Sequence, residues 1–170
     1  MIDIPVATIN ERSPYLVKSF GQNSFLFKTR HGINYNVGFS QDYMVYEKED
    51  TYQFYIVNMD HSHFMYDPDV FRTIEVILEV FFEQEPSILL YICDMIDNRQ
   101  AVRNRLFKLW FDNNQRKDQY TMVNKTLTYE DITYFGAIII KKSHPDHDSI
   151  IEQFNAFIAN LPQKLDELQN

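Results

Sequence analysis

The chain has 170 residues, of which 45% are hydrophobic and 24% charged, the balance of a globular protein that can bury a sizeable core. Its net charge of −8 and its pI near 5.0 argue against general affinity for nucleic acid or for anionic membranes. Because Cys93 is its one cysteine, the chain cannot form an intramolecular disulfide. Its four glycines are too few for most glycine-rich phosphate-binding loops.

The sequence predicts a single globular domain over residues 1–170. It contains no linker, no internal repeat and no apolar run long enough to span a bilayer. Residues 1–13 lack both a hydrophobic period and the pattern of a signal peptide, so we expect a loosely held N-terminal arm. These features favour a cytoplasmic protein that has no membrane partner.

The first elements in chain order predict an antiparallel strand meander. Residues 15–20 and 24–29 alternate apolar and polar side chains on either side of Gly21-Gln22-Asn23, which is typical of a hairpin. Residues 33–39 and 51–59 alternate in the same way and predict two further strands.

A helix is expected to begin at Asp67-Pro68. Asp67 can accept hydrogen bonds from the first free N–H groups, and Pro68 lies where a helix needs no N–H. Apolar residues then recur at helical spacing until Pro86, which marks the end of the helix: Val70, Ile74, Ile77, Leu78 and Phe81.

The next two elements are a short strand and a second helix. Residues 88–93 have no polar face, which indicates a central strand covered on both sides. Asp97 is expected to cap the helix that follows. The buried stripe of that helix is expected to contain Val102, Leu106, Leu109 and Trp110.

The last elements are strands at residues 120–128 and 132–141 and an amphipathic helix at residues 149–168, which Pro162 kinks or splits. The complete order is a strand meander, a helix, a strand, a helix, two strands and a C-terminal helix. We therefore predict an α+β fold in which helices flank a single mixed, mostly antiparallel sheet.

Local features of the second helix accompany this order. Asn98-Arg99-Gln100-Ala101 opens the helix, and residues 107–111 at its end are rich in aromatic side chains. Together with the element order over about residues 25–141, they resemble the core of the GNAT N-acetyltransferase fold. The resemblance implies that acetyl-coenzyme A binds where the strand at residues 88–93 parts from its neighbour. It also implies an Arg/Gln-x-x-Gly-x-Gly/Ala signature, whose glycines admit the coenzyme pyrophosphate at a helix N-terminus.

The chain departs from that signature. The corresponding segment, residues 58–67, contains neither glycine nor arginine. Asp60, Asp67 and Asp69 would instead place negative charge where the phosphates must bind. We therefore expect no ordinary binding of acetyl-coenzyme A, and no cofactor.

A second resemblance lies in residues 91–111, YICDMIDNRQAVRNRLFKLWF. This segment runs from the short strand through an acidic corner into the second helix. It is similar to a bacterial family known only as a domain of unknown function, which implies no activity.

The acidic corner and the helix after it hold the most concentrated polar residues of the chain. Asp94 follows the expected central strand, where open α/β sheets place their ligands. Arg99 and Arg103 are one turn apart and could bind a carboxylate or a phosphate together. The candidate site for a ligand or a partner therefore comprises Asp94, Asp97, Arg99, Arg103 and Arg105. The alternative is a helix cap followed by a solvated basic face with ordinary surface ion pairs.

Positive charge is concentrated on the same helix and its continuation. Between Asn98 and Lys117, six basic residues accompany a single acidic residue, which gives a local charge of +5. On an acidic chain, this charge favours docking to an acidic protein partner or to an acidic surface of a second copy.

Four of the five histidines form two pairs, His61 with His63 and His144 with His147. Histidines at these spacings, with aspartates nearby, can converge on a metal ion. The alternative is that all four are solvated loop residues, and on balance we expect no metal.

Aromatic residues in the meander follow the strand period and offer a stacking platform or a protein interface. The alternative is one core face and a partly exposed second face, and an uncovered aromatic face would favour a homodimer or a protein partner. The set consists of Tyr15, Phe20, Phe25, Phe27, Tyr35, Phe39, Tyr52, Phe54 and Tyr55.

Three classes of function are compatible with the sequence. The first is a non-catalytic interaction or regulatory module on a degenerate acetyltransferase-like scaffold. The second is an atypical acyl-CoA-dependent N-acyltransferase, or another small-ligand enzyme, that uses Asp94, Arg99 and Arg103. The third is a metal-dependent protein. Because the chain has no nucleophile elbow, Walker loop or dinucleotide fingerprint, and because Asp94 disfavours a reactive thiolate at Cys93, we favour the first class.

Overall fold

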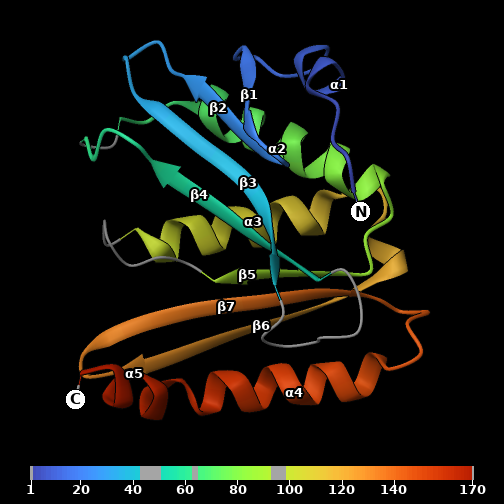
Figure 1. Ribbon diagram of the computed structural model, residues 1–170, viewed down its shortest axis with the longest axis vertical. Coiled ribbons are helices and arrows are strands. Elements are labelled where there is room, and N and C mark those ends of the chain that lie inside the picture. Colours follow the sequence, from blue (N-terminus) through green and yellow to red (C-terminus); the bar gives the residue numbers. More distant parts are fainter. Residues whose placement is uncertain (1, 43–50, 63–64, 93–98, 170) are drawn as a thin grey trace. The chain divides into compact units, whose positions relative to one another are not determined.

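The structure, a computed structural model, describes residues 2–42, 51–62, 65–92 and 99–169 (Figure 1). The chain forms two compact units, one from residues 1–40 and 54–86 and the other from residues 41–53 and 87–170. None of the helices in these described ranges is both long enough and apolar enough to cross a bilayer.

The first unit contains the strand meander and two helices. Its strands are neighbours in chain order, and the pairs β1–β2 and β2–β3 are antiparallel, as the hairpin signals predict. The unit boundary falls within β3 and β4. The elements are α1 (Val6–Asn10), β1 (Val17–Gly21), β2 (Ser24–Lys28), β3 (Asn34–Asp42), β4 (Thr51–Asn58) and α2 (Pro68–Glu83).

The core of the first unit lies between the meander and α2. Phe39 of β3 stacks on Phe81 of α2 with ring centroids 3.9 Å apart, and Phe54 of β4 packs against Phe39 at 5.4 Å. The apolar stripe predicted for this helix is confirmed, because Ile74, Ile77, Leu78 and Phe81 are all buried and Val70 is half-buried.

Most of the aromatic set belongs to this core and not to a second face. Residues directly opposite each other in a sheet share a face, and Phe25 pairs with Val37 while Phe27 pairs with Tyr35. Of the set, Phe20 and Tyr55 lie on the opposite face of the sheet, where Phe20 is exposed and Tyr55 contacts β3. The aromatic platform suggested by the sequence is therefore reduced to these two rings.

Gly38 in β3 allows Tyr55 to lie against the sheet. A Cβ atom at position 38 would lie 2.6 Å from both the Asn23 carbonyl oxygen and the Tyr55 hydroxyl. Because the Asn23 backbone cannot move away easily, we expect Gly38→Ala to lower the free energy of unfolding by about 2 kcal/mol in urea titrations. Gly136→Ala is the matched control, since the one close contact of its Cβ would be with the flexible Cδ1 end of Ile158, at 2.9 Å, and the next, with Phe154, lies at an ordinary 3.7 Å. An equal loss in both variants would contradict this account.

The N-terminal arm differs from the loosely held segment expected from the sequence. Ile9 in α1 is fully buried, and the Asn10 side chain hydrogen-bonds both the N–H and the C=O of Val17, at 2.7 and 2.9 Å. Arg12 forms a two-fold ion pair with Glu83 at the end of α2. The arm is too short to show a helical period, but these contacts fix it to β1 and α2.

The second unit contains the remaining strands, in the spatial order β5-β7-β6, with antiparallel pairing throughout. The C-terminal helix is split next to Pro162, as predicted, and the Tyr129 hydroxyl donates a hydrogen bond to Asp166 of its second part. This bond raises the pKa of Tyr129 to about 12. The elements are β5 (Ile88–Ile92), α3 (Gln100–Asn113), η1 (Lys117–Gln119), β6 (Tyr120–Tyr129), β7 (Ile132–Lys141), α4 (His147–Ala159) and α5 (Leu161–Gln169).

Strand β5 is covered on both faces, as its wholly apolar sequence predicts. Ile88 and Leu90 belong to a buried cluster with Ile150 and Phe154 of α4. Tyr91 has the opposite parity in the strand and lies 4.4 Å from the Phe107 ring of α3. The predicted α+β class and order of elements are therefore confirmed.

Candidate functional site

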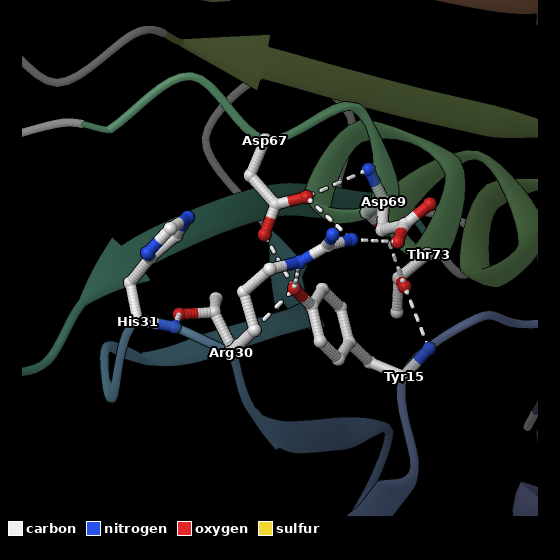
Figure 2. Close-up of polar contacts among 7 residues, drawn as sticks. Tyr15, Arg30, His31, Asp67, Asp69 and Thr73 are labelled. Carbon is white, nitrogen blue, oxygen red and sulfur yellow. Dashed lines mark hydrogen bonds and ion pairs between the residues drawn. The ribbon is translucent and has the colours of Figure 1, made fainter.

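A dense group of polar side chains lies at the N-terminus of α2, within the first unit (Figure 2). It joins the segment before β1, the turn between β2 and β3, and the first turns of the helix. We call this group the α2 clamp, and it comprises Tyr15, Arg30, Asp67, Asp69 and Thr73.

Asp67 is the centre of the α2 clamp. Its side chain is only 2% exposed, and Oδ1 accepts a hydrogen bond from the Asp69 N–H at 3.0 Å. Its carbonyl oxygen accepts from the Val70 N–H at 3.1 Å. The N-cap predicted from Asp67-Pro68 is therefore confirmed, and it uses the N–H groups of the first turn.

Tyr15 and Arg30 complete the α2 clamp from other parts of the chain. The Tyr15 hydroxyl donates to Asp67 and accepts from the backbone N–H and the Nε–H of Arg30, both at 3.1 Å. The Arg30 guanidinium pairs with both Asp67 and Asp69. Figure 2 shows the tyrosine and arginine side chains converging on the Asp67 carboxylate.

The electrostatics of the α2 clamp favour the ionised form of Asp67. Burial on its own would raise the pKa of this carboxyl group. The Tyr15 hydroxyl, the Asp69 N–H and the Arg30 charge outweigh burial, so the pKa of Asp67 lies below its usual range.

The α2 clamp leaves little for an external anion to bind. The N–H groups of the first turn already have acceptors, and two carboxylates hold the one arginine. The sequence places Asp67 and Asp69 at this helix start, and both are found there. Asp60 instead accepts hydrogen bonds from the backbone and side-chain N–H groups of Asn34, at 2.6 and 3.1 Å.

The structure describes part of the site predicted at the acidic corner. Cys93, Asp94 and Asp97 lie outside the described residues, so the ligand site and the helix cap predicted there stay predictions. Helix α3 begins after Arg99. Arg99 and Arg103 are half-buried, and Arg105 is exposed.

The buried side of α3 differs from the sequence expectation. Of the predicted stripe, Trp110 is buried and Leu106 is half-buried, whereas Val102 and Leu109 are exposed. The other buried residues of the helix are Asn104 and Phe107. Phe107 packs between Tyr91 and Trp110, and Asn104 accepts a hydrogen bond from the Asn124 side chain of β6 at 2.8 Å. The hydrogen-bonded Asn104 and the aromatic ring of Phe107 therefore take the buried positions, and Val102 and Leu109 lie at the surface.

The solvent-facing side of α3 combines apolar and basic side chains. Val102 and Leu109 are 49% and 50% exposed, and Arg105 and Lys108 are exposed near them at helical spacing. We call these four residues the α3 outer face. The sequence shows that this side of the helix is basic. It does not show that Val102 and Leu109 are exposed, because their helical spacing predicts that they belong to the core.

The histidines described by the structure have local roles. His144 Nδ1 accepts from the Asp146 N–H at 3.0 Å, and His147 contacts Thr121 at 2.9 Å and Asp148 at 2.7 Å. His61 lies in a turn with φ of 49°, and His63 lies outside the described residues. In the described ranges, His, Cys, Asp and Glu form no group of three that could hold a metal ion.

Comparison with protein families gives a match to part of the chain. A family model described as "Family of unknown function (DUF6169)" matches residues 66–156, from just before α2 to the last turn of α4. No curated protein and no solved structure matches the chain. The match contains α2, β5, α3, β6 and β7, and with them the α3 outer face.

Proposed function

The chain belongs to a family of unknown function (DUF6169), and from this premise we propose that it is a non-catalytic interaction module. The proposed scaffold is a degenerate acetyltransferase-like fold, and the proposed contact surface is the α3 outer face. The partner is a protein that presents apolar side chains within an acidic surface.

The observation that carries this proposal is the half-exposure of Val102 and Leu109 beside two basic side chains. Protein interfaces commonly place apolar anchors at the centre and charged residues around them. Positive charge on this helix contrasts with the net charge of −8 of the whole chain. The contrast favours an acidic partner that is guided to this helix and not to the rest of the surface.

The α2 clamp supports the non-catalytic part of the proposal. A coenzyme pyrophosphate needs free N–H groups and positive potential at a helix N-terminus. At the N-terminus of α2, the Asp67 carboxylate already accepts from the Asp69 N–H, and the carboxylates of Asp67 and Asp69 neutralise the positive charge of Arg30. We therefore expect millimolar acetyl-coenzyme A to leave the melting temperature unchanged in a thermal shift assay. A rise of several degrees would favour the alternative, an atypical acyltransferase or other small-ligand enzyme.

A charge-matched pair of variants tests the contact surface. The probe is a fluorescein-labelled helical peptide with leucine on one face and glutamate on the other, followed by fluorescence anisotropy at low salt. We expect Arg105→Glu/Lys108→Glu to weaken binding at least tenfold, because it repels the acidic peptide at the α3 outer face.

Lys18→Glu/Lys28→Glu is the control, since both lysines are exposed on β1 and β2 and the net charge changes by the same amount. The control should bind within about twofold of the natural chain, because surface charges away from a contact act only through screened long-range forces. Equal weakening in the two double variants, or no binding by the natural chain, would overturn the proposal.

A further inference from the structure

A hydroxyl, an imidazole and a carboxylate lie in series at the start of α4, in the second unit. His147 Nε2 lies 2.9 Å from Thr121 Oγ1 of β6, and His147 Nδ1 lies 2.7 Å from Asp148 Oδ1. Both are hydrogen-bond distances of the kind that join a nucleophile to its base and the base to the group that orients it. The three side chains therefore have the connectivity of a catalytic triad in which threonine is the nucleophile.

Regular elements hold the two ends of this array in place. Thr121 lies directly opposite Ile140 in the β6–β7 ladder, so both side chains lie on the face of the sheet that packs against α4. Ile150, one turn after His147, is fully buried in the same cluster as Ile140. This packing fixes the first turn of α4 beside the start of β6 and keeps the imidazole close to the hydroxyl.

The carboxylate determines which nitrogen of His147 carries the proton. A carboxylate can only accept hydrogen bonds, so the bond to Asp148 places the proton of the neutral imidazole on Nδ1. The lone pair of Nε2 then accepts from the Thr121 hydroxyl. In this arrangement, His147 can remove the hydroxyl proton as the oxygen attacks an electrophile. Asp148 is a positioning residue, because it keeps the imidazole in the required tautomer.

A small reagent can reach the array from solvent. The His147 side chain is 22% exposed and Thr121 is half-buried. The Asp148 side chain is 96% exposed and places a negative charge near the hydroxyl. This charge repels an anionic phosphoryl donor, whereas it does not repel the carbonyl group of an uncharged ester. The chemistry of the surroundings therefore favours an acyl donor.

We propose that Thr121 is a modification site that takes an acyl group from an activated, uncharged ester. Thr121 Oγ1 forms a bond to the carbonyl carbon, and His147 Nε2 takes the hydroxyl proton. The bond between that carbon and the alcohol oxygen of the ester breaks, and the leaving alkoxide receives the proton from His147. The products are an O-acyl threonine and the free alcohol. This inference goes beyond the proposed function, because it concerns a covalent change in β6 and not a contact at the α3 outer face.

Labelling of the natural chain with p-nitrophenyl acetate tests the proposal. Peptide mass spectrometry follows the acetylation of each threonine over time. Thr128 is the control within the same strand, since it is exposed and its hydroxyl contacts that of Thr133. We expect Thr121 to react about a hundredfold faster than Thr128, because a general base typically contributes that much. Equal rates at the two threonines would overturn the proposal.

Substitutions in the array distinguish base catalysis from a structural contact. His147→Gln can keep a hydrogen bond to Thr121 but cannot act as a general base, so the ratio of the two acetylation rates should fall to about one. Asp148→Ala should lower the ratio less, about threefold, because its side chain is exposed. Thr121→Ser keeps a hydroxyl nucleophile and should stay reactive. An unchanged ratio in His147→Gln, or an unreactive Thr121→Ser, would overturn the proposal. The ratio in the natural chain tests it even if His147→Gln does not fold.

Discussion

Replacing Asp67 with alanine should lower the free energy of unfolding by about 3 kcal/mol, measured by urea denaturation. Loss of an N-cap typically costs about 1 kcal/mol, and loss of a hydrogen bond to a buried charged group about 2 kcal/mol. Asp67 makes both interactions, to the Asp69 N–H and to the Tyr15 hydroxyl, with a side chain that is 2% exposed. The fold of the first unit therefore depends strongly on this one carboxylate.

Asp69→Ala is the matched control within the same turn. Asp69 pairs with Arg30 through a side chain that is 41% exposed, so its loss should change the unfolding free energy by less than about 1 kcal/mol. A double-mutant cycle between Tyr15→Phe and Asp67→Ala should give a coupling of about 1–2 kcal/mol. Additive effects in that cycle would contradict the direct bond between the two side chains.

The α2 clamp also predicts a direction of pH dependence. The pKa of Asp67 is lower in the folded than in the unfolded chain, where it lies near the ordinary value of about 3.9. The unfolded chain therefore binds the proton first as pH falls. The stabilisation by Asp67 is complete above about pH 4 to 5 and is lost as pH falls through the folded pKa. Asp67→Ala should accordingly lose less stability than the natural chain between pH 5 and pH 3.

The α2 clamp shows how far the sequence could be read. Asp67-Pro68 predicts the helix start and its cap correctly, because those interactions are local. Tyr15 and Arg30 could not be assigned, since they lie 52 and 37 residues from Asp67 in the chain. Nothing near either residue marks it as a partner. The sequence therefore shows negative charge at this helix start, but not the cation and the hydroxyl that balance it.

Helix α3 shows the opposite error, in which a local pattern misleads. Val102, Leu106 and Leu109 recur at helical spacing, so periodicity assigns them to the core. The structure buries Phe107 because Tyr91 and Trp110 provide aromatic surfaces on both sides, and it buries Asn104 because Asn124 satisfies it. Such partners come from other elements and leave no trace in the helix's own sequence. For the same reason, the sequence did not indicate that Val102 and Leu109 belong to the α3 outer face.

A pair of alanine substitutions on α3 should separate the two sides of the helix. Phe107→Ala should lower the free energy of unfolding by about 4 kcal/mol, because it removes a ring that is 4% exposed and leaves a cavity between Tyr91 and Trp110. Leu109→Ala should change it by less than about 0.5 kcal/mol, since half of that side chain already lies in water. Urea denaturation of both variants provides the measurement.

The contrast between these two residues also links stability to function. If Leu109 belonged to the core, as its spacing indicates, its loss would cost as much as other buried leucines, about 2–5 kcal/mol. A small loss of stability together with weaker binding of the acidic amphipathic peptide would mean that the side chain serves a contact and not the fold. A large loss of stability for Leu109→Ala would indicate that the side chain is buried in the core. It would also remove the observation on which the proposed docking surface depends.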